Sequence, residues 1–362
     1  MKKNQILTKT KYPIKKAAVL TLCCLLMAGA LSACSSTGTV EDTAVKVMLV
    51  DGAPLISMTA MMSDGFAGMD GYDISYTITN DSDALVAALL NQEPDFAIAP
   101  INVAAMMNNN LSGYRLAAVT IWGIMHIVSD RDVMSLEDLK GETVVAFGRS
   151  GTPGITLRAV LRQSGIRFTE PDSADFMPDP DVVSIIYLTA ASDVRDAIAT
   201  GMMAGGKAVS FGLLAEPVAT AITGFAANAG RPGFTAKINL QQEWARNNNG
   251  EIFPQAALIF HERLLDGHPK FVNEFIAMAE QSSVRANASP AETGDLAVSL
   301  GSIAIPNGTV VGAAHSAGRL PMDFTYAADA KPAVDRYLQA FMDENANLIG
   351  GKLPADSFYY AY

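Results

Sequence analysis

The stretch from Val144 to Arg162 constrains the fold of this chain more than any other. Apolar residues 144–147 lead into a glycine-rich turn at 148–154 and then into an amphipathic run with apolar residues at helical spacing. This order predicts a strand, a loop and a helix. Ser150 or Thr152 can cap the helix. The unpaired N–H groups of its first turn would point beyond the end of the strand, where we expect a small ligand.

The same alternation of strand and helix runs along most of the chain. We predict strands at 45–50, 72–78, 96–99, 116–121, 144–147, 183–188 and 208–213, most of them followed by a helix-like run. This alternation predicts βαβ units and a mainly parallel sheet in each of two lobes that are built alike. Later segments are read as a strand running back at 255–260 and as closing helices at 271–285 and 332–342.

The chain begins like a bacterial lipoprotein. Residues 1–16 carry six lysines and no acid, and residues 17–30 are apolar. An apolar run this short predicts a secretory signal, because a spanning helix needs about 20 apolar residues. Leu31-Ser32-Ala33-Cys34 then resembles a lipobox, which implies cleavage before Cys34 and lipidation of its thiol. Ordinary signal cleavage that leaves an unmodified cysteine is the alternative.

The cysteine count favours lipidation. Two of the three cysteines, Cys23 and Cys24, lie in the predicted signal, so the mature chain holds only Cys34 and forms no internal disulfide. A lone thiol in a secreted protein is easiest to explain if it carries lipid. The residues that follow, 34–43, form a short tether rich in Ser, Thr and Gly.

Composition and charge exclude several functions. The formal charge is −11, and loss of the leader lysines makes the chain more acidic still, so its surface repels nucleic acid. The chain that remains after Cys34 is too long for one small domain and suits two lobes. With 49% hydrophobic residues it can build real cores.

Motifs for catalysis or metal binding are incomplete. Residues 201–208 imitate a phosphate-binding loop, but Ala208 stands where Ser or Thr would hold magnesium. Residues 148–151 lack the glycine spacing of a nucleophile elbow. The histidines show no metal-ligand spacing; they are His126, His261, His268 and His315. We therefore expect no enzymatic activity, no cofactor and no metal site.

Several motifs in order resemble one family. They are the lipobox, the early strand ending near Pro54, residues 94–100 (PDFAIAP), residues 135–141 (SLEDLKG), the 148–154 loop, residues 215–219 (AEPVA) and the ending at 349–354. Together they resemble the solute-binding lipoproteins of ABC importers, in the group described for nitrate, sulfonates, taurine and thiamine-pyrimidine precursors. The resemblance implies the type II periplasmic-binding fold, with two α/β lobes and a ligand in the cleft between them.

The resemblance also sets the expected organisation. We expect a signal at 1–33, the tether at 34–43, one lobe from 44–125 plus 262–345, a second lobe at 126–260 and a tail at 346–362. The expected protein is a monomer, lipid-anchored outside the bacterial cell membrane, that delivers a small organic ligand to an ABC permease. An extracellular enzyme on the same fold and a signalling or adhesive lipoprotein without a transport partner are the alternatives.

Residues at the predicted strand ends should face the cleft. The candidate ligand-binding residues are Pro54, Ser57, Pro100, Thr120, Trp122, Arg149, Ser150, Gly151, Thr152, Ala190, Ser210 and Glu216. Trp122 can stack on a planar ligand or serve as a core residue. Arg149 can pair with a sulfonate or carboxylate or point to solvent, and Glu216 can bind a ligand amine or cap a helix. Sulfonate, pyrimidine and flavin-like ligands all fit this pattern.

Overall fold

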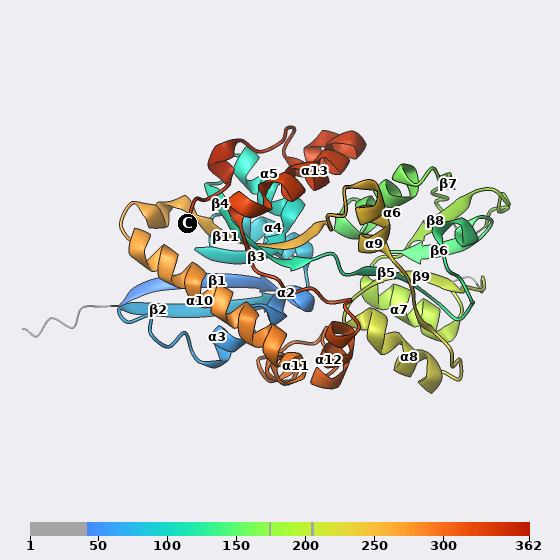
Figure 1. Ribbon diagram of the computed structural model, residues 1–362, viewed down its shortest axis with the longest axis horizontal. Helices are drawn as coiled ribbons and strands as arrows, with labels where there is room; N and C mark the ends of the chain where they lie inside the picture. Colours follow the sequence, from blue (N-terminus) through green and yellow to red (C-terminus); the bar gives the residue numbers. More distant parts are fainter. Residues whose placement is uncertain (1–41, 174, 204–205) are drawn as a thin grey trace, which may run out of the picture. The chain divides into compact units, whose positions relative to one another are not determined.

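The computed structural model describes residues 42–173, 175–203 and 206–362. The predicted signal, the lipobox cysteine Cys34 and the tether up to residue 41 lie outside the described residues. From Thr43 to Tyr362 the chain forms one compact unit. It contains two six-stranded sheets with helices packed on them (Figure 1). We call each sheet with its helices a lobe.

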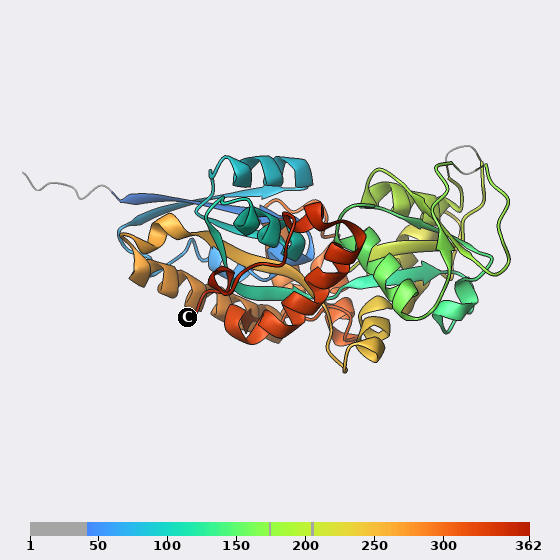
Figure 2. The same cartoon turned by 90° about the horizontal axis from the view of Figure 1, so that it is seen from above.

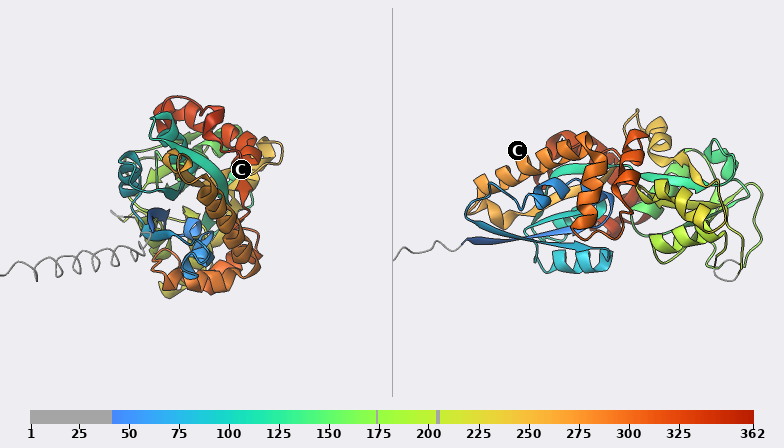
Figure 3. Two further views of the ribbon diagram at one scale, coloured as in Figure 1. Left: turned by 90° about the vertical axis from the view of Figure 1, so that its left-hand side faces the viewer. Right: turned by 90° about the horizontal axis from the view of Figure 1, so that it is seen from below.

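Lobe 1 is built on the first sheet. In spatial order its strands are β12 (Thr325–Tyr326), β4 (Tyr114–Trp122), β11 (Pro254–His261), β3 (Phe96–Pro100), β1 (Thr43–Val50) and β2 (Tyr72–Thr79). Its helices are α2 (Ala53–Ile56), α3 (Thr59–Ser63), α4 (Ser82–Leu90), α5 (Ile101–Asn109), α10 (Pro269–Ala288), α11 (Pro290–Ser299), α12 (Gly308–Ser316) and α13 (Ala327–Asn345). Figure 3 shows α10 lying along this sheet, with α11 and α12 following it.

Lobe 2 is built on the second sheet. In spatial order its strands are β10 (Thr235–Asn239), β5 (Met125–Ser129), β9 (Phe211–Ala215), β6 (Thr143–Ala146), β8 (Val183–Tyr187) and β7 (Phe168–Thr169). Its helices are α6 (Thr152–Gln163), α7 (Ala191–Thr200), α8 (Val218–Asn228) and α9 (Leu240–Asn247). Short 3₁₀ turns occur at η1 (Leu136–Leu139), η2 (Glu262–Leu265), η3 (Ala346–Ile349) and η4 (Asp356–Phe358).

Both sheets are mixed. The sheet of lobe 2 is mainly parallel, as expected, because β7 also pairs in parallel with β8. The sheet of lobe 1 has more antiparallel than parallel pairings, which corrects the expectation for that lobe. In lobe 1, β1 pairs in parallel with β2 and β3, but β11 pairs antiparallel with β3 and β4. In lobe 2, β6 pairs in parallel with β8 and β9, whereas β5 pairs antiparallel with β9 and β10. The strands β4, β5 and β11 begin or end at the connections between the sheets. A parallel pair needs a crossover that brings the chain back in the same direction, and these connections do not provide one.

The chain passes between the sheets twice. It goes from β4 to β5 through Gly123 and Ile124, and it returns from α9 to β11 through residues 248–253. We expected lobe 2 to extend to residue 260, but β11 lies between β3 and β4 in the first sheet. The sheet topology therefore ends lobe 2 before Pro254. The apolar pattern of a segment predicts that it forms a strand, but not which sheet that strand joins.

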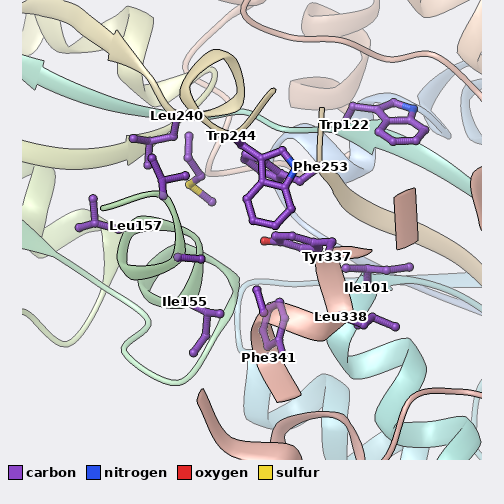
Figure 4. Close-up of a cluster of buried hydrophobic side chains, with 14 of the residues drawn as sticks. Ile101, Trp122, Ile155, Leu157, Leu240, Trp244, Phe253, Tyr337, Leu338 and Phe341 are labelled. Carbon is purple, nitrogen blue, oxygen red and sulfur yellow. The ribbon is translucent and has the colours of Figure 1, made fainter. Parts of the chain in front are cut away.

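One apolar core includes residues of both lobes. Figure 4 shows Trp244 of α9, Phe253 and Tyr337 of α13 close together, with Ile155 of α6 nearby. The Phe253 and Tyr337 rings stack with centroids 5.2 Å apart, and the Trp244 ring meets Tyr337 edge-on at 5.4 Å. Such aromatic pairs stabilise by about 0.5–1.5 kcal/mol beyond the area they bury. This core holds the two connections and α13 against lobe 2.

Helix α13 also links the lobes, through side-chain contacts. It runs from β12 of lobe 1 to α6 of lobe 2 (Figure 2). Near its end, Glu344 accepts hydrogen bonds from Arg158 at 3.1 Å and from Arg162 at 2.6 Å. Within the described part of the chain, none of these helices is both long and apolar enough to cross a bilayer.

Candidate ligand-binding site

The two connections between the lobes meet at Gly123. Its backbone N–H donates to the carbonyl of Phe253 at 2.8 Å. A Cβ atom at position 123 would lie 2.7 Å from the Phe253 ring and 2.8 Å from Cβ of Gln241. These distances are shorter than real carbon contacts, so only glycine fits between the ring and the first turn of α9. The contact places Gln241 at the junction of the lobes.

Three buried carboxamides lie on the segments that meet near this junction, and we call them the junction amides: Asn102, Gln241 and Gln255. Their side chains belong to the first turn of α5, the first turn of α9 and the start of β11. They are 6%, 3% and 7% exposed. Across residues 42–362 as far as the structure describes them, Asn102 Oδ1, Gln255 Oε1 and both amide atoms of Gln241 have no hydrogen-bond partner.

Gln255 connects the lobes through α6. Gln255 Nε2 donates to Thr152 Oγ1 at 3.2 Å, so a lobe 1 strand touches the first residue of a lobe 2 helix. Pro100 pairs with Ala256, so α5 and Asn102 begin beside Gln255. The site is therefore bounded by the N-terminal turns of α5, α6 and α9. Buried polar groups that the protein leaves unpaired are costly, which points to an outside partner.

The loop before α6 differs from the predicted cap. The N-cap residue is Gly151, and it makes no side-chain capping bond. Instead the Gly148 carbonyl accepts hydrogen bonds from Gly151 N at 2.9 Å and from Gly154 N at 3.1 Å. The prediction that Ser150 or Thr152 caps the helix was therefore wrong. The loop carbonyl occupies N–H groups that we expected to face a ligand.

Arg149 already has acidic partners in the protein. Its guanidinium lies 3.6 Å from Glu170 and 3.5 Å from Asp172, and its side chain is half exposed. It also lies over the Tyr187 ring, with 5.5 Å to the centroid. The Arg149 carbonyl accepts a hydrogen bond from buried Arg158. A ligand anion would have to compete with these two carboxylates.

Glu216 is also engaged by the protein. Its Oε1 accepts from Arg319 Nε at 2.7 Å, and its Oε2 accepts from Thr220 N at 3.0 Å. Burial raises the pKa of the Glu216 carboxyl, and the bonds from Arg319 and Thr220 act against this rise. Arg319 follows α12 of lobe 1, so its ion pair with the buried Glu216 carboxylate also joins the lobes. The bond from Thr220 N resembles the helix-capping role that we gave as the alternative for Glu216, because Thr220 lies in the first turn of α8.

The other predicted residues fall into separate groups. Pro54 is the second residue of α2. Ala190 is the exposed N-cap of α7, and Ser57 is buried and donates to the Pro54 carbonyl at 2.9 Å. Thr120 is buried within β4. Ser210 precedes β9, beside the amino end of β6, because the strand begins three residues later than we predicted. The structure therefore does not bring Ser210 to the carboxyl edge.

Trp122 is the last residue of β4 and is 9% exposed. Its indole Nε1 donates to the Asp323 carbonyl at 2.9 Å. It lines a hollow of about 430 Å³ between the 250–252 connection and residues 323–333. Another hollow of about 440 Å³ lies in lobe 2 beside Arg162 and Phe168. Neither hollow includes a junction amide.

Sequence reasoning missed all three junction amides. The sequence carries a signal for two of them. Gln255 is the one uncharged polar residue in the otherwise apolar run 254–260, and Asn102 lies two residues after the predicted site residue Pro100. Gln241 gives no such local signal, because it sits beside Gln242 in a polar helix. Its burial depends on neighbours distant in the sequence, such as Gly123.

Known proteins that resemble this chain were found among solved structures. No protein-family model matches the sequence, and no curated protein matches it either. A crystal structure described as an ABC transporter from Parabacteroides distasonis aligns with a TM-score of 0.69 and 20% identity, over 88% of this chain and 99% of that chain.

Two further structures are similar. The ligand-binding component of an ABC-type import system from Staphylococcus aureus aligns with a TM-score of 0.59 and 12% identity, over 88% of this chain and 97% of that chain. The periplasmic aliphatic sulphonate binding protein SsuA from Escherichia coli aligns with a TM-score of 0.60 and 15% identity, over 86% and 92%. The chain thus has the two-lobe α/β fold of the substrate-binding proteins of ABC transporters.

Proposed function

We propose that this protein is the solute-binding component of an ABC importer. It captures a small organic molecule between its two lobes and delivers it to a permease in the membrane. No bond of the ligand is made or broken. The proposal is supported by the fold, which the protein shares with binding proteins of this class, and above all by the junction amides.

The junction amides carry the proposal because they come from both lobes. Asn102 and Gln255 belong to lobe 1, and Gln241 belongs to lobe 2. A ligand that bonds to both sides binds more tightly when the lobes are together than when they are apart. It therefore shifts the population toward the closed state by hinge motion at the two connections. The permease would then recognise the closed arrangement.

Ligand binding and closure can be tested on the purified chain beginning at Ser35. Native mass spectrometry should detect a small molecule that copurifies with the protein. Removing that molecule by unfolding and refolding, then adding it back, should raise the melting temperature and reduce the radius of gyration in X-ray scattering. A released molecule that differs chemically from the one supplied would show an enzyme instead and contradict the proposal.

We also propose that Cys34 carries the lipid that holds the protein at the membrane. Multiple acyl chains anchor a protein far more firmly than the marginal binding of one chain. A Cys34→Ser variant should therefore move from the membrane fraction to the soluble extracytoplasmic fraction. Ser35→Ala, the adjacent control, should remain with the membrane. Cys34→Ser that still sediments with membranes would contradict lipid anchoring.

A further inference from the structure

The junction amides restrict the chemistry of the ligand. Gln241 is the most informative, because neither its amide oxygen nor its amide nitrogen finds a partner among the residues that the structure describes. Whichever way this amide is turned, it offers an accepting oxygen and an N–H donor side by side, on atoms bonded to the same carbon. A ligand that satisfies both must itself present an acceptor and a donor side by side. An anion such as a sulfonate group accepts hydrogen bonds only.

The charges that follow the same strand ends are already neutralised within the protein. Arg149 pairs with Glu170 and Asp172, and Glu216 pairs with Arg319. At the end of β1, Asp51 accepts bonds from Ile303 N at 2.8 Å and Ala304 N at 3.0 Å, and also from the Ser302 hydroxyl. A charged ligand at the junction would be buried without a counter-charge of its own, at high cost.

We propose that the ligand is an uncharged molecule with a ring amide or imide edge that pairs with the carboxamide of Gln241. Such an edge presents C=O and N–H on adjacent atoms, so two parallel hydrogen bonds form with one primary amide. Gln255 and Asn102 then bind the remaining polar atoms of the ring. This inference rests on the proposed function and deepens it by naming the ligand class. It separates this protein from a binding protein for aliphatic sulfonates such as the one from Escherichia coli.

The role of Gln241 can be tested by Gln241→Met. Methionine matches the length of glutamine but cannot bond to the ligand. Because the Gln241 amide has no partner in the described chain, its loss should leave the melting temperature of the unliganded protein unchanged or higher. Ligand retention should fall by about tenfold or more. Gln242→Met, on the exposed neighbour, should change neither.

A stability loss in Gln241→Met would show that the amide has a structural role and would overturn the inference. Retention of the ligand at the wild-type level would overturn it as well. Gln255→Met provides a second variant, although it also removes the bond to Thr152. It should reduce ligand retention by a similar factor.

The ligand class itself can be tested by capture. The refolded, ligand-free protein is incubated with the small-molecule fraction of a bacterial extract, to which uracil and ethanesulfonate are added as probes. Bound compounds are then released with acid and identified by mass spectrometry. We expect an uncharged compound with a ring amide or imide, retained equally at about 0.05 M and 0.5 M salt because no ion pair is screened.

The outcomes separate the two proposals. Capture of ethanesulfonate or another anion would overturn the inference about ligand class and leave the binding function standing. Capture of a cation would do the same. If the wild-type protein retains no compound at all, the binding function fails, and the inference that rests on it fails too.

Discussion

His126 and Glu216 lie side by side, and burial moves their pKa values in opposite directions. Burial and the nearby charge of Arg319 lower the pKa of His126 to about 3. Burial raises the pKa of Glu216. His126 Nε2 lies 3.9 Å from Glu216 Oε1, but the imidazole is neutral at pH 7, so the approach is not an ion pair. Among the residues that the structure describes, Arg319 supplies the positive charge that faces Glu216.

Acid should therefore destabilise the protein through His126. Its folded-state pKa lies below its ordinary value, so the folded state takes up the proton later than the unfolded state. The stability from this group is complete above about pH 6.5 and is lost as the pH falls toward 3. Between pH 7 and pH 5 the loss from His126 alone should be about 2 kcal/mol, measured as the difference between the wild type and a His126 variant in urea unfolding at both pH values.

A variant isolates this contribution. Glu216 acts in the opposite direction, because its raised pKa gives stability at low pH that is lost as the pH rises. Burial also lowers the pKa of His261, which acts in the same direction as His126. The wild type therefore shows the sum of all three groups, and the difference between the wild type and a His126 variant isolates this one. His126→Gln should lose the destabilisation by acid, whereas His268→Gln, in the turn that precedes α10, should keep it. Equal pH dependence in wild type and His126→Gln would contradict the assignment.

Helix α6 shows how a loop and a helix determine each other. A Cβ atom on Gly154 would lie 2.7 Å from the Gly148 carbonyl oxygen and 2.8 Å from the Arg149 carbonyl oxygen. These contacts are with backbone, so no side-chain rotation relieves them. The close approach allows the loop carbonyl to bond to the first turn of α6. It also sets the position of Thr152, which meets Gln255 of lobe 1.

Gly154→Ala should displace this loop. We expect the free energy of unfolding to fall by about 1–3 kcal/mol, as for other overpacked sites, and ligand affinity to fall because Thr152 moves. The matched control is Gly224→Ala in α8, where a Cβ atom would meet nothing within 4 Å. That change should stabilise the protein by up to about 1 kcal/mol. Denaturant unfolding and ligand titration measure both variants. Equal stability of the two would contradict the steric argument.

Two ion-pair systems join the lobes of the whole molecule. In the first system, Glu344 of α13 binds Arg158 and Arg162 of α6. In the second system, Arg319 of lobe 1 binds Glu216 of lobe 2. The side chains of Arg158 and Glu344 are only 6% and 16% exposed, so solvent screens their interaction weakly. These contacts resist separation of the lobes and should tune the energy of hinge opening.

Glu344→Gln should weaken the link between α13 and α6. Arg158 keeps Glu170 as a partner at 3.0 Å, so we expect a loss of about 1.5–3 kcal/mol rather than unfolding. Glu274→Gln is the control, because its partner Lys270 is 88% exposed. It should leave stability nearly unchanged, because solvent screens an exposed pair. Thermal or urea unfolding distinguishes the two, and a loss no larger than that of the control would contradict a link between the lobes.

The order and type of the elements could be predicted well from the sequence. Predicted strands at 45–50, 72–78 and 96–99 match β1, β2 and β3 within two residues at each end. The errors have local causes. Strand β9 begins at Phe211, three residues later than predicted, and it extends to Ala215. Strands β5 and β10 and helices α9, α11 and α12 were not predicted, because their apolar residues are few or match no single period.

By itself the sequence determined the alternation of strands and helices, and through it the fold class, because the spacing of apolar residues encodes which face of each element is buried. Only the tertiary structure decided which side chains share the site. Thr152 and Gln255 are 103 residues apart, as are Glu216 and Arg319. Burial and charge pairing depend on such distant neighbours. For that reason Arg149 and Glu216, which were chosen from local pattern, proved to be paired with other residues of the protein. The junction amides could be recognised as a group only from the tertiary structure.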